Sequence, residues 1–183
     1  MRDGGKGGSR TQTGAAFENL HTDLLHFLQG SDSYIQEGNN IYARQGQVRK
    51  DDNVIAKLYH KNKFYSEFLK NADVDYTRII SRRIIPDVVV EVIDTKFLAI
   101  IEAKFQKNPG STDEKIQTCD FKQKQFRKLI PANYKFKYIY LLNKWFKDKK
   151  GYADDLRYIK KTENCDYCIE QIPNDYIPGL GNK

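Results

Sequence analysis

Two apolar runs separated by a short break constrain this chain more than any other feature. Residues 88–92 and residues 97–101 are apolar at nearly every position, which is typical of strands buried on both faces of a sheet. The break between them, residues 93–96, is short enough for a tight turn. The two runs therefore predict an antiparallel hairpin in the interior of the fold.

Charged residues gather at the open end of this expected hairpin. If the turn centres on Asp94 and Thr95, Asp87 lies directly opposite Glu102, and directly opposed residues share one face of a sheet. Lys104 lies two positions beyond Glu102 and therefore points to the same face. Two carboxylates and one ammonium group thus converge where burying charge is costly, unless the groups are paired or hold a metal ion.

Two explanations of this charged cluster are consistent with the residues alone. In the first, Lys104 neutralises one of the acids, and the cluster is a salt-bridged strand end of the kind that also occurs in purely structural positions. In the second, the carboxylates of Asp87 and Glu102 hold a metal ion, because hard oxygen ligands of this type suit Mg²⁺.

The same residues resemble a known nuclease signature. Pro86-Asp87 followed by Glu102-Ala103-Lys104 resembles the PD-(D/E)XK motif, and the surrounding pattern is similar to that of type II restriction endonucleases. The resemblance covers about residues 15–145. It implies an α/β fold with a restriction-endonuclease-like core, in which helices flank a mixed central sheet that carries the catalytic hairpin. We expect one such domain over residues 15–183, preceded by a flexible arm over residues 1–14.

The resemblance also implies roles for individual residues in a Mg²⁺-dependent endonuclease acting on double-stranded DNA. Asp87, Glu102 and the main-chain carbonyl of Ala103 are the expected ligands of one or two Mg²⁺ ions. Lys104 is expected to orient or help deprotonate the attacking water and to offset developing negative charge. Many nucleases of this family carry an acidic residue on the first core helix near the metal, and Glu18 is the candidate here. A carboxylate at that place also suits the helix dipole, which is the structural explanation of Glu18.

The remaining chain fits a single domain around the hairpin. Its 183 residues are enough to bury a core. Cys165 and Cys168 form a lone CxxC pair without a second pair of ligands, so we expect them to pack in a strand rather than to hold zinc. Apolar spacing and turn residues predict helices over residues 15–29, within residues 53–70, and over residues 111–129 and 152–160, and strands over residues 136–142 and 165–172.

The charge of the chain indicates a polyanionic partner. The formal net charge is +7, which favours binding to nucleic acid but is also found in proteins that are merely basic. Ser111 and Glu114 form a capping box, so the next helix begins directly after the expected catalytic strand and its first turn and lysines can reach the DNA backbone. The residues expected to contact DNA are Arg82, Arg83, Lys107, Ser111, Lys115, Lys122 and Lys124.

The setting in which such a nuclease acts stays open between several alternatives. The chain has little beyond the expected catalytic core with which to read bases, so we favour a cleavage subunit that takes its specificity from a larger recognition or nicking subunit. A homodimer that cuts both strands of a palindromic site is the competing arrangement. A DNA repair nuclease, a junction resolvase and a non-catalytic nucleic-acid-binding protein are further alternatives. Without an apolar segment long enough for a membrane span or a signal peptide, we expect a cytoplasmic protein with no membrane partner.

Overall fold

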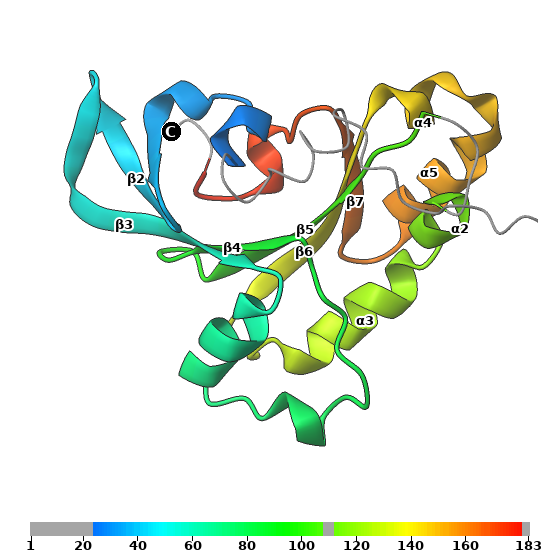
Figure 1. Cartoon of the computed structure of the whole chain (residues 1–183), viewed down its shortest axis with the longest axis horizontal. Helices are drawn as coiled ribbons and strands as arrows, with labels where there is room; N and C mark the ends of the chain where they lie inside the picture. The colour runs from blue at the N-terminus through cyan, green and yellow to red at the C-terminus, as the bar shows by residue number, and fades with distance from the viewer. Residues whose placement is uncertain (1–23, 108–111, 181–183) are drawn as a thin grey trace, which may run out of the picture.

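The expected hairpin lies in the middle of a seven-stranded mixed sheet (Figure 1). It consists of β4 (Val88–Val92) and β5 (Phe97–Lys104), which pair antiparallel with Val88 opposite Ile101 and Val92 opposite Phe97. This is the predicted register, which is therefore confirmed. Every residue of β4 and the first six residues of β5 are buried, as expected for strands covered on both faces.

The computed structural model describes residues 24–107 and 112–180 of the chain. The expected arm over residues 1–14, Glu18 and Ser111 lie outside these described residues. Most of the helix expected over residues 15–29 also lies outside them, and its described end forms a short 3-10 helix, η2 (Leu24–Phe27).

The seven strands follow one another across the sheet in chain order. Strands β1 (Tyr34–Glu37), β2 (Asn40–Gln45) and β3 (Val48–His60) continue through β4 to β5 as antiparallel neighbours. β6 (Lys135–Leu142) then runs parallel to β5, and β7 (Cys165–Ile169) runs parallel to β6. Because parallel neighbours require a crossover connection, helices join β5 to β6 and β6 to β7.

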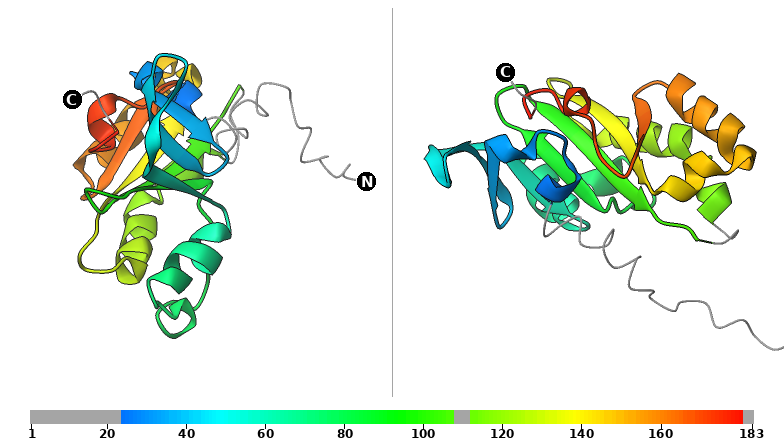
Figure 2. Two further views of the ribbon diagram at one scale, coloured as in Figure 1. Left: turned by 90° about the vertical axis from the view of Figure 1, so that its left-hand side faces the viewer. Right: turned by 90° about the horizontal axis from the view of Figure 1, so that it is seen from above.

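The crossover helices share one apolar core on one face of the sheet, which we call the helix-covered face. The π-helix η4, which precedes β4, lies beside α3 on this face, and the contact of Phe64 with Phe126 joins the two (Figures 1 and 2). The opposite face packs against η2 and the C-terminal segment around Ile172, Ile177 and Leu180. The helical segments are η3 (Ser31–Ser33), η4 (Phe64–Leu69), η5 (Tyr76–Arg78), α2 (Thr112–Ile116), α3 (Cys119–Leu129), α4 (Lys144–Asp148), η6 (Lys150–Tyr152), α5 (Ala153–Lys161) and η7 (Asn174–Tyr176).

Strand alternation places the charged residues of the hairpin on the helix-covered face. Val89 and Ile100 belong to the core under the helices, whereas Val88 and Ile101 belong to the opposite core. Side chains two residues apart share a face, so Asp87, Glu91, Glu102 and Lys104 all point toward the helices.

Two of the expected elements differ from the structure. The helix expected within residues 53–70 is wrong for its first half, because β3 continues to His60 and only η4 is helical. Ala56 and Leu58 face one core while Tyr59 faces the other, and pairing with β2 and β4 satisfies the backbone of this segment. The helix expected over residues 111–129 is divided by a turn at residues 117–118 into α2 and α3.

The last strand and its cysteines also depart in part from the expectation. β7 ends at Ile169, and Ile172 makes only an isolated bridge to Leu28. Cys165 and Cys168 pack in β7 as expected, but in opposite cores, so the two thiols face away from each other across the sheet. The strand expected over residues 136–142 and the helix expected over residues 152–160 are confirmed as β6 and α5. Among the described residues, no helix is both long enough and apolar enough to cross a membrane.

The same substitution at a buried and at an exposed valine tests the central position of the hairpin. Val90→Ala in β4 is expected to lower the free energy of unfolding by ~2–3 kcal/mol, since it removes buried methyl groups and leaves a cavity. Val48→Ala is the matched control, because Val48 is 65% exposed and Val90 is 0% exposed. Urea denaturation of both variants measures the difference, and equal losses would contradict the buried position of β4.

Candidate active site

The open end of the hairpin brings together the three charged residues of the expected motif. The ammonium group of Lys104 lies 2.6 Å from Oε1 of Glu102. The backbone N–H of Ala103 donates a hydrogen bond to Oδ2 of Asp87, with an N···O distance of 2.9 Å. The first contact lies along β5 and the second joins β5 to the residue before β4, so the hairpin alone positions these groups.

A second ammonium group reaches the same carboxylate from α3. Nζ of Lys122 lies 2.9 Å and 3.0 Å from the two carboxylate oxygens of Glu102. The Lys122 side chain is 17% exposed and the Lys104 side chain 18% exposed, so both contacts are largely shielded from water. Lys122 was expected to contact DNA, and in the structure its ammonium group forms an ion pair with the Glu102 carboxylate.

Two residues near the carboxylates have no counterpart in the expected site. The Tyr138 hydroxyl in β6 donates a hydrogen bond to Oε2 of Glu102. The backbone N–H of Lys61, just after β3, donates to the main-chain carbonyl of Asp87, and the charge of Lys61 acts on the Asp87 carboxylate. In the sequence, Tyr138 stands out only as a hydroxyl-bearing residue in an apolar strand. Lys61 is one of many lysines, so nothing in the sequence points to its place near Asp87.

The two carboxylates have opposite electrostatic environments. Burial opposes the ionisation of Glu102, but the charges of Lys104 and Lys122, together with hydrogen bonds from Lys104 and Tyr138, hold its pKa below the ordinary value. Burial raises the pKa of Asp87 above its ordinary value, and the charge of Glu102 adds to the rise. Lys104, the Ala103 N–H and Lys61 offset only part of this effect. The fold therefore favours the ionised form of Glu102 and disfavours that of Asp87.

The oxygen atoms at this end of the hairpin are of the type that Mg²⁺ prefers. The N–H and C=O groups of a strand residue point to the same side, so the Ala103 carbonyl lies on the Asp87 side of β5. The next carbonyl, that of Lys104, points the other way and accepts from the backbone N–H of Asn143. No group of three His, Cys, Asp or Glu side chains that could hold a metal occurs in the described part of the chain. Two carboxylates and a carbonyl are nevertheless sufficient for Mg²⁺, which keeps several waters and binds substrate phosphate.

The other residues expected to contact DNA lie on several different segments of the chain. Lys124 pairs with Asp120 at 2.8 Å on the exposed side of α3, and Lys107 lies over the ring of Phe105. Lys115 is exposed on α2. Arg82 and Arg83 lie instead in a surface groove that Lys122 also lines.

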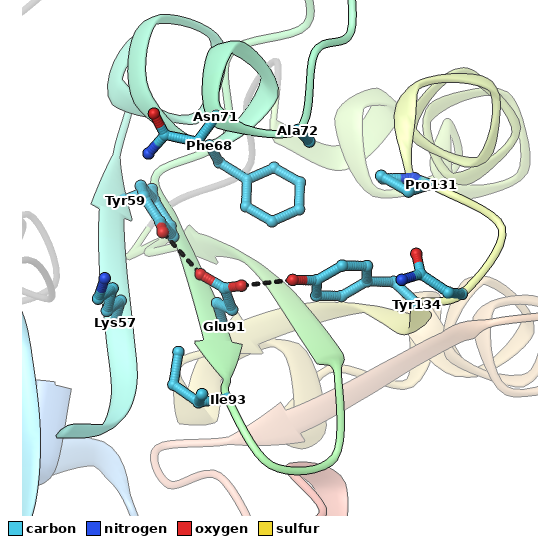
Figure 3. A pocket seen from close by; sticks show the side chains of 10 residues that line it. Lys57, Tyr59, Phe68, Asn71, Ala72, Glu91, Ile93, Pro131 and Tyr134 are labelled. Atoms are coloured by element: carbon cyan, nitrogen blue, oxygen red, sulfur yellow. Dashed lines mark hydrogen bonds between the residues drawn. The ribbon is translucent and has the colours of Figure 1, made fainter. Parts of the chain in front are cut away.

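A second buried carboxylate on the helix-covered face, Glu91, has a different environment (Figure 3). It lies four residues along β4 from Asp87, or roughly 13 Å at the rise of a strand. The hydroxyl groups of Tyr59 and Tyr134 donate to its two oxygens, each at 2.6 Å, and the Phe68 ring packs against both tyrosines. A cavity of about 430 Å³ borders this cluster. Because each oxygen accepts a hydrogen bond from a neutral group, these bonds account for the burial of Glu91.

The opposite pKa shifts predict opposite effects of the two amide substitutions on stability. Asp87→Asn is expected to raise the free energy of unfolding near pH 7.5 by about 0.5–2 kcal/mol, a usual size for a stabilising substitution. The amide removes a disfavoured charge but still accepts from Ala103. Because the pKa of Asp87 is raised in the folded protein, the carboxylate destabilises the fold fully at pH values above the folded pKa. The gain in stability from Asp87→Asn should vanish below about pH 4, where the carboxyl group is protonated in both the folded and the unfolded state.

Glu102→Gln is expected to destabilise the protein by roughly 1–3 kcal/mol at pH 7.5, because it leaves two largely buried ammonium groups without a carboxylate. The pKa of Glu102 is lowered, so its stabilising effect is present above the unfolded pKa and lost as the pH falls through the folded pKa. Urea unfolding at several pH values measures both variants. Asp94→Asn, at the exposed turn, is the control, and a loss of stability in Asp87→Asn at pH 7.5 would contradict the environment assigned to Asp87.

Comparison with known proteins adds no independent assignment for this site. The chain matches no protein-family model, no curated protein and no solved structure. The chemistry of the site therefore has to be inferred from its own residues and their geometry.

Proposed function

We propose that this chain is a Mg²⁺-dependent endonuclease that hydrolyses phosphodiester bonds of double-stranded DNA. The observation that carries the proposal is the unequal compensation of the two carboxylates at the open end of the hairpin. Glu102 has two ammonium partners, so a structural ion pair explains it. Burial raises the pKa of Asp87 even though the charges of Lys104 and Lys61 act on it, so its charge is only partly compensated. Carboxylates kept in an unfavourable environment beside other charges are typical of functional sites.

The residues of the site divide the work of phosphodiester hydrolysis between them. Asp87, Glu102 and the Ala103 carbonyl would hold Mg²⁺, which supplies positive charge for the phosphate oxygens and lowers the pKa of a bound water. Lys104 orients the attacking water and stabilises the charge that develops on phosphate. Lys122 keeps Glu102 compensated when Lys104 turns toward the substrate, so we assign it a positioning role.

The fold is compatible with a restriction-endonuclease-like core. An antiparallel hairpin, a helical crossover and a parallel strand follow one another as β4, β5, α2 with α3, and β6, which is the order that the PD-(D/E)XK resemblance implies. The net charge of +7 suits a polyanionic substrate. Within this proposal we favour a restriction system, with the chain acting beside a larger recognition subunit or a second copy of itself.

The activity test uses Asp87→Asn, because this variant is expected to keep its fold. Wild-type protein with Mg²⁺ should nick supercoiled plasmid, and excess EDTA should abolish nicking. Asp87→Asn should lower the rate by about 10²-fold or more, since it removes a metal ligand. Lys104→Ala should lower it by about 10²-fold through loss of charge stabilisation, with little change in DNA binding.

Two further measurements make this test decisive. Asp94→Asn should cut at the wild-type rate, because Asp94 lies at the exposed turn of the hairpin, away from its open end. Mn²⁺ binding followed by electron paramagnetic resonance should be weaker in Asp87→Asn than in wild type, whether or not a partner subunit is needed for cutting. Wild-type nicking by Asp87→Asn, or nicking that persists in EDTA, would rule out the proposal.

A further inference from the structure

A surface groove leads away from the candidate active site along α3. The segment of residues 79–84, which precedes the hairpin, forms one side, and a stripe of α3 residues forms the other. The groove has a volume of about 750 Å³. Its α3 side consists of side chains that share one helical face: Thr118, Phe121, Lys122, Gln125 and Lys128.

All charged side chains that line this groove are cationic. They are Arg82 and Arg83 on one side and Lys122 and Lys128 on the other, and no described Asp or Glu is among the lining residues. The Arg83 guanidinium lies 5.8 Å from the ring centre of Tyr65, so its position is partly fixed before any ligand binds. Like charges held along one groove repel each other, and a chain of phosphates is the partner that relieves this repulsion.

An aromatic ring stands among these cations. Phe121 is 61% exposed although the buried residues of the same helix, Cys119 and Phe126, face the core. Ile79 across the groove is 40% exposed. A single exposed apolar residue needs no explanation, but an aromatic ring flanked by cations is the arrangement with which proteins bind single-stranded nucleic acid, because each base can stack on the ring. Bases within a duplex are already stacked on their neighbours, so the ring suits an unpaired base.

Lys122 connects the groove with the carboxylates. It lines the groove and also holds both oxygens of Glu102. We propose that the groove binds an unpaired segment of the DNA strand next to the bond that is cut, with a base stacked on Phe121 and phosphates on Arg82, Arg83 and Lys128. This inference rests on the proposed function and narrows its substrate to DNA that is unpaired, or becomes unpaired, beside the cleavage site.

Binding measurements without cleavage test this inference. Full-length protein carrying Asp87→Asn is titrated in EDTA against a fluorescent blunt duplex, a forked duplex with unpaired arms and a single strand. The forked duplex and the single strand should bind more tightly than the blunt duplex. Phe121→Ala should weaken binding to these two DNAs by about 5- to 150-fold, which is the range for loss of one stacking platform, and leave blunt-duplex binding within about 2-fold.

Control variants separate stacking from charge and from misfolding. Phe121→Trp should restore binding, because tryptophan also offers a flat ring. Tyr158→Ala removes an exposed aromatic residue from α5, outside the groove, and should change nothing. Arg82→Ala combined with Lys128→Ala should weaken binding to all three DNAs and reduce the salt dependence of affinity.

The possible outcomes distinguish this inference from the proposed function. Equal affinity for forked and blunt DNA, or no effect of Phe121→Ala on any DNA, would overturn the inference even if wild-type protein nicks plasmid. Tight, Phe121-dependent binding to the forked duplex would support the groove, and if wild-type protein then neither cuts this DNA with Mg²⁺ nor binds Mn²⁺ through Asp87, only the nuclease assignment falls.

Discussion

The sharing of one buried carboxylate by two ammonium groups is the interaction on which the rest of the site depends. Glu102 follows five apolar residues in β5, and a lone charge there would be too costly to bury. Lys104 compensates it from the same strand, and Lys122 compensates it from α3. Because Lys122 and Glu102 come from different elements, their contact joins the open end of the hairpin to the helix that follows it.

Asp87 and Glu91, two other carboxylates on the helix-covered face, have different partners from Glu102. Glu91 receives hydrogen bonds from two phenols and borders a cavity that Lys57, its neighbour on β3, also lines. Asp87 receives one backbone hydrogen bond, and burial raises its pKa in spite of the lysines nearby. Under the proposed function, the stability that the fold gives up at Asp87 keeps a metal ligand in the site.

Under the proposed function, the position of α3 links the chemistry of the site to recognition of the substrate. Its buried side holds the apolar core, and the side next to the segment of residues 79–84 carries the cations and the exposed ring of the groove. Lys122 lies where these two surfaces meet. An occupant of the groove would therefore act on the partner of Glu102 directly, so that binding of phosphate and the charge state of the site are coupled through one side chain.

The sequence by itself determined the hairpin, its register and the convergence of Asp87, Glu102 and Lys104. Strands buried on both faces appear in a sequence as continuous apolar runs. A short turn fixes the register of the two strands, and in this register the charged residues at their open ends lie opposite each other. The same local reading failed for residues 53–60, because only pairing with β2 and β4 decides that this spaced apolar pattern forms a strand. Lys122 and Tyr138 lie 20 and 36 residues from Glu102, and the groove needs α3 to pack beside the segment of residues 79–84. Tertiary structure alone decided these contacts, since local periodicity specifies which face a side chain takes but not which distant element covers it.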